Sequence, residues 1–133
     1  MFKRLFSALR GAPTPAFYLP TEAEVEIRDS GLAVQILEPG NERKPDETDT
    51  VTVRYAGWTP DGKRFDASYP GTAKFPLNRV IGGWTEGLQL LGEGGSARLV
   101  IPPDLAYGAR GAPPRIGRNQ TLVFHVELVR VEG

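Results

Sequence analysis

The chain has 133 residues, 40% of them hydrophobic and 24% charged, which is typical of a single soluble domain with a core. It carries 16 basic and 16 acidic residues, so nothing indicates the basic surface with which proteins usually bind nucleic acid. The absence of cysteine excludes disulfides, thiol nucleophiles and thiolate metal sites, and a single histidine, His125, excludes a metal site built from several histidines.

The first eleven residues predict a short amphipathic helix. Phe2, Leu5, Phe6 and Leu9 recur at the spacing of one helical face, basic residues take the other face, and the first acid is Glu22. Such a segment is typical of a targeting sequence or a membrane-surface helix. It is equally consistent with a short helix that docks on its own domain or frays. The sequence contains no run of 18 apolar residues, so it predicts no membrane span.

Prolines predict a linker over residues 11–22. We therefore expect an N-terminal segment over residues 1–23 and a folded domain over residues 24–133. We expect a monomer in the cytoplasm. Targeting to the periplasm or to an organelle through the N-terminal segment, and contact of residues 1–10 with a membrane, are the alternatives.

Alternating hydrophobic residues predict about five antiparallel strands in the domain. In the last of them Phe124 faces the core, while His125 faces a side that we expect to be partly wet. The alternating segments are 25–27, 32–36, 51–55, 97–101 and 122–128, and residues 64–68 begin a return strand after a tight turn at 60–63.

One helix is predicted inside the domain, over residues 82–95. Trp84, Leu88 and Leu91 recur at helical spacing and face inward, and Gly92 ends the helix. Several antiparallel strands and one short helix make an α+β domain in which the helix covers the apolar face of the sheet.

The loop over residues 101–117, "IPPDLAYGARGAPPRIG", is rich in proline and glycine and carries Tyr107 and Ile116. Prolines stiffen a loop and glycines let its backbone approach a partner closely, which is typical of the rim of a binding site. A simpler reading is that the prolines only stop the flanking strands. We expect bulky residues at strand ends and in loops to come together between the sheet and the helix, where they would form either a pocket or ordinary core. These residues are Tyr55, Phe65, Phe75, Val80, Ile81, Trp84, Tyr107, Ile116 and Phe124.

Several motifs in order resemble the FKBP-type peptidyl-prolyl cis-trans isomerases, from about Asp29 to Glu132. The matching segments are "VTVRYAGW", "DGKRFDAS", "FPLNRVIGGWTEGLQLL", "ARLVIPPDLAYGARGAPP" and "TLVFHVEL", and their forms look most like bacterial members. The resemblance implies a strongly curved antiparallel sheet wrapped on one helix. It also implies acceleration of cis-trans rotation at X–Pro bonds during protein folding.

The resemblance implies roles for individual residues. Trp84 would be the floor under the proline ring, the Ile81 N–H and the Tyr107 hydroxyl would donate to carbonyls of the bound peptide, and Asp66 would bind the Tyr55 hydroxyl at the pocket edge. The implied proline pocket comprises Tyr55, Phe65, Asp66, Val80, Ile81, Trp84, Tyr107, Ile116 and Phe124, and the implied catalytic residues among them are Tyr107, Asp66, Ile81, Phe124 and Trp84.

No cofactor or metal is expected, because twisting an amide needs neither. The expected partners are proline-containing polypeptides, with tacrolimus or rapamycin as inhibitors. The alternative is a binding or chaperone module that grips proline segments and turns them over incidentally or not at all.

The chain departs from the family pattern beside the pocket. The segment after Asp66 is short and offers no arginine that clearly matches the basic partner found in some members, so the partner of this aspartate stays open. Gly117 and Arg118 stand where many relatives have two prolines, which predicts a looser and more basic loop tip.

Overall fold

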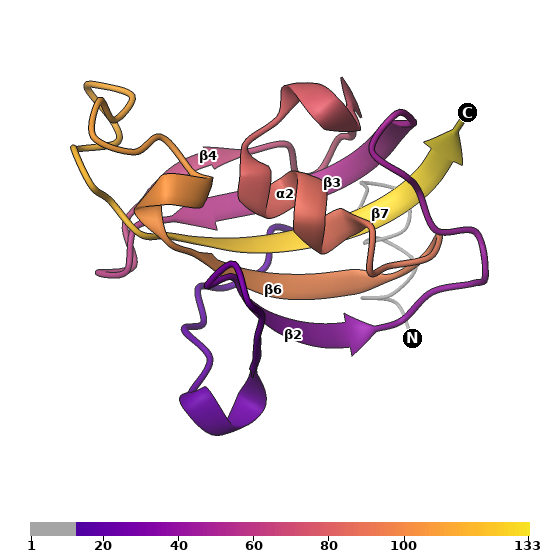
Figure 1. The fold of residues 1–133 in the computed structure, drawn as a ribbon, viewed down its shortest axis with the longest axis horizontal. Helices are drawn as coiled ribbons and strands as arrows, with labels where there is room; N and C mark the ends of the chain where they lie inside the picture. Colours follow the sequence, from indigo (N-terminus) through magenta and orange to yellow (C-terminus); the bar gives the residue numbers. More distant parts are fainter. Residues whose placement is uncertain (1–12) are drawn as a thin grey trace.

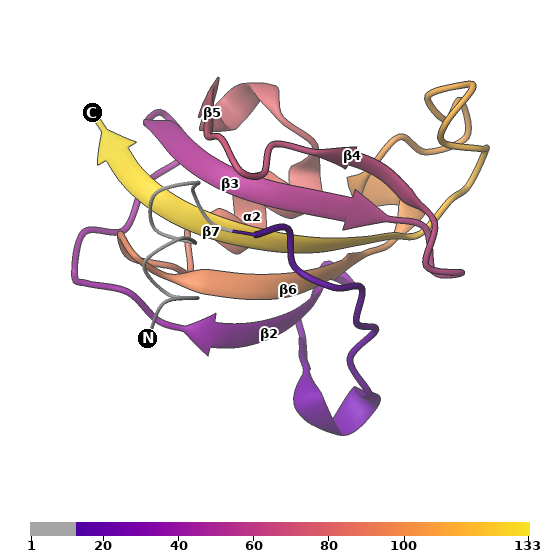
Figure 2. The same ribbon diagram turned by 180° about the vertical axis from the view of Figure 1, so that it is seen from behind.

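A computed structural model describes residues 13–133, so the helix predicted for the first eleven residues lies outside the described part. Seven strands form one antiparallel sheet in the order β1-β2-β6-β7-β3-β4, with β5 also paired to β3 (Figures 1 and 2). No helix among the described residues is long and apolar enough to cross a membrane. The strands are β1 (Glu26–Ile27), β2 (Ala33–Glu38), β3 (Thr50–Trp58), β4 (Arg64–Ala67), β5 (Ala73–Pro76), β6 (Ser96–Ile101) and β7 (Leu122–Glu132).

The only α-helix in residues 13–133, α2 (Gly82–Leu88), lies across one face of the curved sheet (Figure 1). The predicted length was wrong, because the Leu90 and Leu91 N–H groups donate to carbonyls three residues back and close tight turns. Leu91 is nevertheless fully buried, as the helical spacing predicted. Three single-turn 3₁₀ helices complete the elements of residues 13–133: η1 (Glu22–Glu24), η2 (Leu77–Arg79) and η3 (Pro103–Leu105).

The core lies between α2 and the concave face of the sheet. Trp84 and Leu88 from the helix pack with Leu99 of β6 and Leu128 of β7 in one buried cluster. A Cβ atom on Gly83 would lie 2.6 Å from the Ile101 side chain, so the glycine lets helix and sheet approach closely. The predicted fold class, a curved antiparallel sheet on one short helix, is confirmed.

Strand β5 was not predicted. It pairs with the first half of β3, with Val51 opposite Phe75, whereas β4 pairs with the second half of β3. Two short strands thus share one edge of β3. The consequence for the site is that Phe75 is held on a strand and packs against the core.

The convex face of the sheet is partly covered by residues 13–21, which we call the strap (Figure 2). The Phe17 ring meets the Trp58 ring edge-on at a centroid distance of 5.8 Å. The Arg98 guanidinium lies 4.4 Å above the centre of the Tyr18 ring, and the Tyr18 hydroxyl donates to Glu24 at 2.6 Å. Residues that were predicted as a linker on their proline content therefore pack against the sheet.

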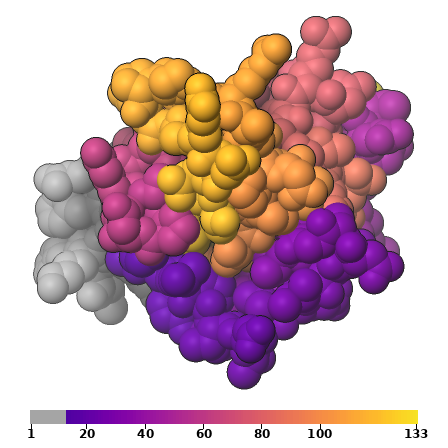
Figure 3. Space-filling model, turned by 60° about the vertical axis from the view of Figure 1, so that its left-hand side comes forward, coloured from indigo at the N-terminus to yellow at the C-terminus, as the bar shows by residue number. Residues whose placement is uncertain are grey.

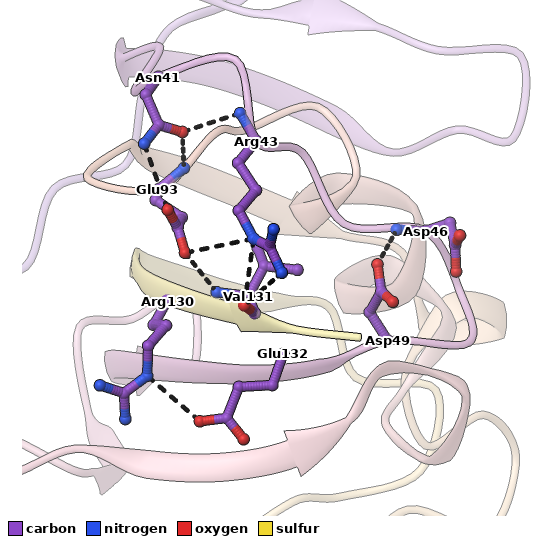
Figure 4. A network of polar contacts seen from close by, with 8 residues as sticks. All are labelled: Asn41, Arg43, Asp46, Asp49, Glu93, Arg130, Val131 and Glu132. Carbon is purple, nitrogen blue, oxygen red and sulfur yellow. Dashed lines mark hydrogen bonds and ion pairs between the residues drawn. The ribbon is translucent and has the colours of Figure 1, made fainter.

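At the end of β7 far from Leu122, polar contacts fasten the loop between β2 and β3 (Figure 4). The Asn41 side-chain oxygen accepts from the backbone N–H groups of Arg43 and Glu93, each at 2.9 Å. Glu93 accepts from the Val131 N–H at 2.9 Å, and the Arg43 guanidinium donates to the Val131 carbonyl. The sheet is thus tied by hydrogen bonds at this end.

Candidate functional site

A hollow of about 470 Å³ opens between the concave face of the sheet and the start of α2. Strands β3, β4, β5 and β7 supply its walls, and η2, α2 and the loop between β6 and β7 complete it. The residues that line the hollow are Tyr55, Phe65, Asp66, Phe75, Arg79, Val80, Ile81, Trp84, Tyr107 and Phe124.

Trp84 stands at the centre of the aromatic lining. Its indole meets the ring of Tyr55 at a centroid distance of 4.9 Å, that of Phe124 at 5.3 Å and that of Phe75 at 5.8 Å. All three pairs are edge-to-face, with interplanar angles of 76° to 82°, an arrangement that aromatic quadrupoles favour. The perpendicular rings leave a hollow that can receive a small apolar ring.

Gly57 explains how two of these rings reach the hollow. It lies opposite Phe124 in the β3–β7 register and next to Asp66 in the β3–β4 register. A Cβ atom at this position would lie 2.6 Å from the Phe124 ring and 2.7 Å from the Phe65 ring. The missing side chain therefore makes the space in which the two rings meet at 5.5 Å.

The polar edge of the hollow is built by Tyr55 and Asp66. The Tyr55 hydroxyl donates to one carboxylate oxygen of Asp66 at 2.7 Å, and the Ala67 N–H donates to the other at 2.9 Å. Burial, and then the bond to Asp66, raise the pKa of Tyr55, so the phenol keeps its proton at neutral pH. The bond between Tyr55 and Asp66 that the resemblance implied is thus present, whereas within residues 13–133 Asp66 forms no ion pair with a basic residue.

Two donors at the mouth have no partner among residues 13–133. The Ile81 N–H, at the start of α2, makes no hydrogen bond there, although the Ile81 carbonyl accepts from Trp84. Tyr107 is 42% exposed and its hydroxyl makes no hydrogen bond. Both groups therefore have a donor available at the mouth of the hollow, and the carbonyl-binding role that the sequence resemblance implied for them stays a prediction.

The rim loop over residues 102–121 is tied to itself by backbone bonds. Ala112 and Ile116 exchange two hydrogen bonds, at 2.9 and 3.1 Å, and the Asn119 N–H donates to the Gly108 carbonyl at 2.9 Å. The Arg115 guanidinium also donates to the Phe65 carbonyl at 2.7 Å, which fastens the loop to β4.

Eight of the nine predicted pocket residues line the hollow, and Ile116 does not. The Ala112–Ile116 bridge folds the loop back, so Ile116 is 4% exposed and belongs to the core. Sequence reasoning missed Arg79, which lines the hollow from η2, and it placed Phe75 only provisionally. The signal that the sequence offered is the position of Arg79 itself, a basic residue directly before the "VIGGW" segment.

The chemistry available in the hollow is limited to burial and hydrogen bonding. Its walls are mainly aromatic and aliphatic, and Asp66 and Arg79 are its charged residues. In the described part of the chain, no three histidine, aspartate or glutamate side chains gather as metal ligands would. His125 lies outside the lining residues, with its ring 6.4 Å from that of Tyr69.

Comparisons with known proteins agree with this geometry. The sequence pattern of the family described as FKBP-type peptidyl-prolyl cis-trans isomerase matches residues 41–129. The chain is 49% identical over 109 residues to a probable FKBP-type peptidyl-prolyl cis-trans isomerase FkpA of Neisseria meningitidis, covering 80% of this chain and 40% of that protein. It is 45% identical over 106 residues to FK506-binding protein 1A of Emericella nidulans, covering 76% of this chain and 98% of that protein.

A solved structure of a peptidyl-prolyl cis-trans isomerase from Pseudomonas syringae has a TM-score of 0.80 to this chain and is 39% identical to it. The match covers 99% of this chain and 92% of that structure. The chain spans less than half the length of the FkpA relatives that it matches.

Proposed function

The chain belongs to the FKBP-type peptidyl-prolyl cis-trans isomerase family, and we propose that its aromatic hollow accelerates cis-trans rotation at X–Pro bonds of polypeptides. The observation that carries the proposal is an open hollow of about 470 Å³ with Trp84 in its lining, built from eight of the nine residues that the sequence resemblance implied for a proline pocket. A role in protein folding follows from this activity.

The proposed mechanism rests on removing water from the imide. Rotation about an X–Pro bond is slow, taking tens to hundreds of seconds unaided, because resonance holds the amide planar. Water stabilises this polar planar form, and the rings of Tyr55, Trp84 and Phe124 would replace the water. The twisted form is less charge-separated and loses less on transfer, so the hollow stabilises it relative to the planar forms.

Hydrogen bonds would add to this difference. The Ile81 N–H and the Tyr107 hydroxyl would donate to carbonyls of the substrate and hold it while the prolyl amide turns. Each tenfold acceleration requires about 1.4 kcal/mol of differential stabilisation, so desolvation and two placed donors together can supply several such factors. Tyr55, Phe65, Asp66, Val80 and Phe124 would shape the pocket, and no cofactor takes part.

The test is a protease-free measurement of cis-trans exchange in a blocked Ala-Leu-Pro-Phe peptide by NMR. We expect catalytic amounts of the protein to accelerate exchange and tacrolimus (FK506) or rapamycin to abolish the acceleration, since the fungal relative is named for FK506 binding. Equal exchange rates with and without the protein would reject the proposal. Peptide binding without faster exchange would instead favour the alternative, a module that only grips proline segments.

Monomeric state and cytoplasmic location remain our predictions, and sedimentation and fractionation of the native host are their tests. Targeting or membrane contact through residues 1–10 is the alternative that fractionation would reveal.

A further inference from the structure

A second hollow, of about 670 Å³, adjoins the aromatic one at the edge of the sheet. The two hollows share Phe65 and Asp66 of β4, which ends the strand order of the sheet and is therefore an edge strand. The β3–β4 turn, the strap and the tip of the rim loop supply the rest. The lining residues are Thr14, Thr59, Lys63, Arg64, Phe65, Asp66, Ala67, Tyr69, Pro114 and Arg115.

The tip of the rim loop closes one side of the second hollow. Figure 3 shows this loop (orange) beside the β3–β4 segment (magenta) on one face of the molecule. Arg115 donates to the Phe65 carbonyl at 2.7 Å, directly at the boundary of the two hollows. Arg115 therefore lines the second hollow next to Phe65, which the two hollows share.

The second hollow is positively charged although the chain as a whole is neutral. Lys63, Arg64 and Arg115 line it and are exposed, against the single carboxylate of Asp66. Within residues 13–133 none of these three cations forms an ion pair: the six pairs found there involve other arginines and Lys74. Both oxygens of Asp66 already accept hydrogen bonds, from Tyr55 and Ala67.

Asp61 is an acid near the hollow: a hydrogen bond from the Thr59 hydroxyl and, to a lesser extent, the charge of Lys63 lower its pKa, but within residues 13–133 the Asp61 and Lys63 side chains form no ion pair. Asp61 lies in the β3–β4 turn outside the lining residues, and its carboxylate accepts from the Thr59 hydroxyl and the Lys63 N–H within that turn. Within residues 13–133, three cationic side chains without an ion-pair partner therefore face a hollow that shares Phe65 and Asp66 with the proposed proline pocket.

We propose that the second hollow is a substrate subsite that favours an acidic side chain within about two residues of the target proline. The inference rests on the proposed function, because it assumes that the proline enters the aromatic hollow. Two extended residues of a substrate span roughly 7 Å, which is more than the roughly 4.8 Å between adjacent strands. A substrate can therefore cross the edge strand β4 with two residues. The cations would attract a glutamate or aspartate and disfavour a lysine there.

The test compares blocked hexapeptides that differ only by Glu or Gln, placed two residues before or two residues after the proline. We expect kcat/KM to be about three- to tenfold higher for one Glu peptide than for its Gln counterpart at low salt, mainly through KM. In 1 M salt, where the screening length is about 3 Å, the ratio should approach one. Equal kcat/KM for every Glu and Gln pair at low salt would overturn the subsite.

Two variants locate the preference. In the double variant Lys63→Gln/Arg64→Gln the Glu-to-Gln ratio should fall towards one. The control matched in charge is Arg110→Gln/Arg118→Gln, which removes two exposed positive charges from the rim loop at residues that do not line either hollow, and it should keep the wild-type ratio. A ratio that survives in Lys63→Gln/Arg64→Gln would also overturn the proposal, because the preference would then arise elsewhere.

Failure of the proposed function gives a different pattern. If no peptide is isomerised faster in the presence of the protein, the isomerase activity is rejected. Fluorescence anisotropy of labelled versions of the same peptides still compares the binding of Glu and Gln peptides. Tighter binding of a Glu peptide, lost in Lys63→Gln/Arg64→Gln, would keep the subsite as part of a binding module. Equal binding would reject the subsite as well.

Discussion

Two almost fully buried tryptophans lie on opposite sides of the sheet, Trp84 in α2 and Trp58 in β3, and only Trp84 lines the candidate site. Trp84 on the concave side is 4% exposed and Trp58 in β3 is 5% exposed. Trp84 is surrounded by perpendicular rings that leave a hollow of about 470 Å³ beside it. Trp58 meets Phe17 of the strap and lines neither hollow. The exposed fraction of the side chain therefore does not distinguish a tryptophan that lines a hollow from one that is covered, whereas the space left beside the ring does.

Removing the indole of Trp84 or of Trp58 is the strongest test of this difference between the two sides of the sheet. Trp84→Ala and Trp58→Ala should each destabilise the fold by about 3–5 kcal/mol, because both remove a large buried side chain. Only Trp84→Ala should also lower kcat/KM of the folded protein, by tenfold or more, since about 1.4 kcal/mol of transition-state stabilisation corresponds to that factor. Urea unfolding and peptide isomerisation at 10 °C measure the two effects separately. A comparable loss of activity in folded Trp58→Ala would show that the faces are not independent.

The second prediction concerns the cover of the convex face. Phe17→Ala should cost about 1–2 kcal/mol of stability, because the ring is only partly buried and a fully buried one contributes about 1.5–3 kcal/mol. The fluorescence of Trp58 should shift to the red as water reaches it, while isomerase activity stays unchanged.

Leu19→Ala provides the matched control within the strap, since Leu19 is 45% exposed and should matter by less than about 0.5 kcal/mol. Unchanged unfolding of Phe17→Ala would mean that the strap does not contribute to stability in solution.

The fold was largely predictable because its signals are local. Alternation over residues 97–101 and 122–128 corresponds to β6 and β7, and the spacing of Trp84, Leu88 and Leu91 predicted their inward faces even though α2 ends at Leu88. Strand β5 was missed because four residues that end in a proline give too short a pattern.

Features that depend on distant contacts were not predictable. The prolines of the strap indicate an extended chain, but only the folded sheet determines that Phe17 meets Trp58. The Ala112–Ile116 bridge turns Ile116 into the core although its sequence neighbours form the rim. The second hollow draws its lining from separate segments, including the strap, β4 and the rim loop, so no single motif indicates it.

A third prediction compares two tyrosines of the concave site. Tyr55→Phe removes the 2.7 Å bond to Asp66 and should cost about 1 kcal/mol of stability as well as some activity. Tyr107→Phe should leave stability within about 0.5 kcal/mol, because this exposed hydroxyl makes no hydrogen bond within residues 13–133. Its kcat/KM should fall about two- to fivefold through loss of one donor to the substrate. Unchanged kinetics of Tyr107→Phe would remove this hydroxyl from the mechanism.

The smallest expected effect is a pH dependence of stability that comes from His125, the single histidine of the chain, on the convex face of the sheet. Its Nδ1 atom is buried without a hydrogen-bond partner among the described residues, and Arg98 lies opposite it in the β6–β7 register. Burial, and then the charge of Arg98, lower the pKa of His125, while Glu127 opposes this shift. The folded protein therefore takes up this proton at a lower pH than the unfolded chain does.

The sign of the pH dependence follows from this difference. Well above about pH 6.5, the ordinary pKa of histidine, His125 is neutral in both the folded and the unfolded state, so stability does not depend on it. As the pH falls below that value, the unfolded chain binds the proton first, so stability is progressively lost until the folded state is protonated as well. Acidic groups with lowered pKa, such as Glu93 and Glu132, add a loss of the same sign at lower pH. The difference between wild type and His125→Gln isolates the histidine: the wild type should lose stability relative to the variant between pH 7 and pH 5. Parallel stability curves over that range would contradict the burial of this ring on the convex face.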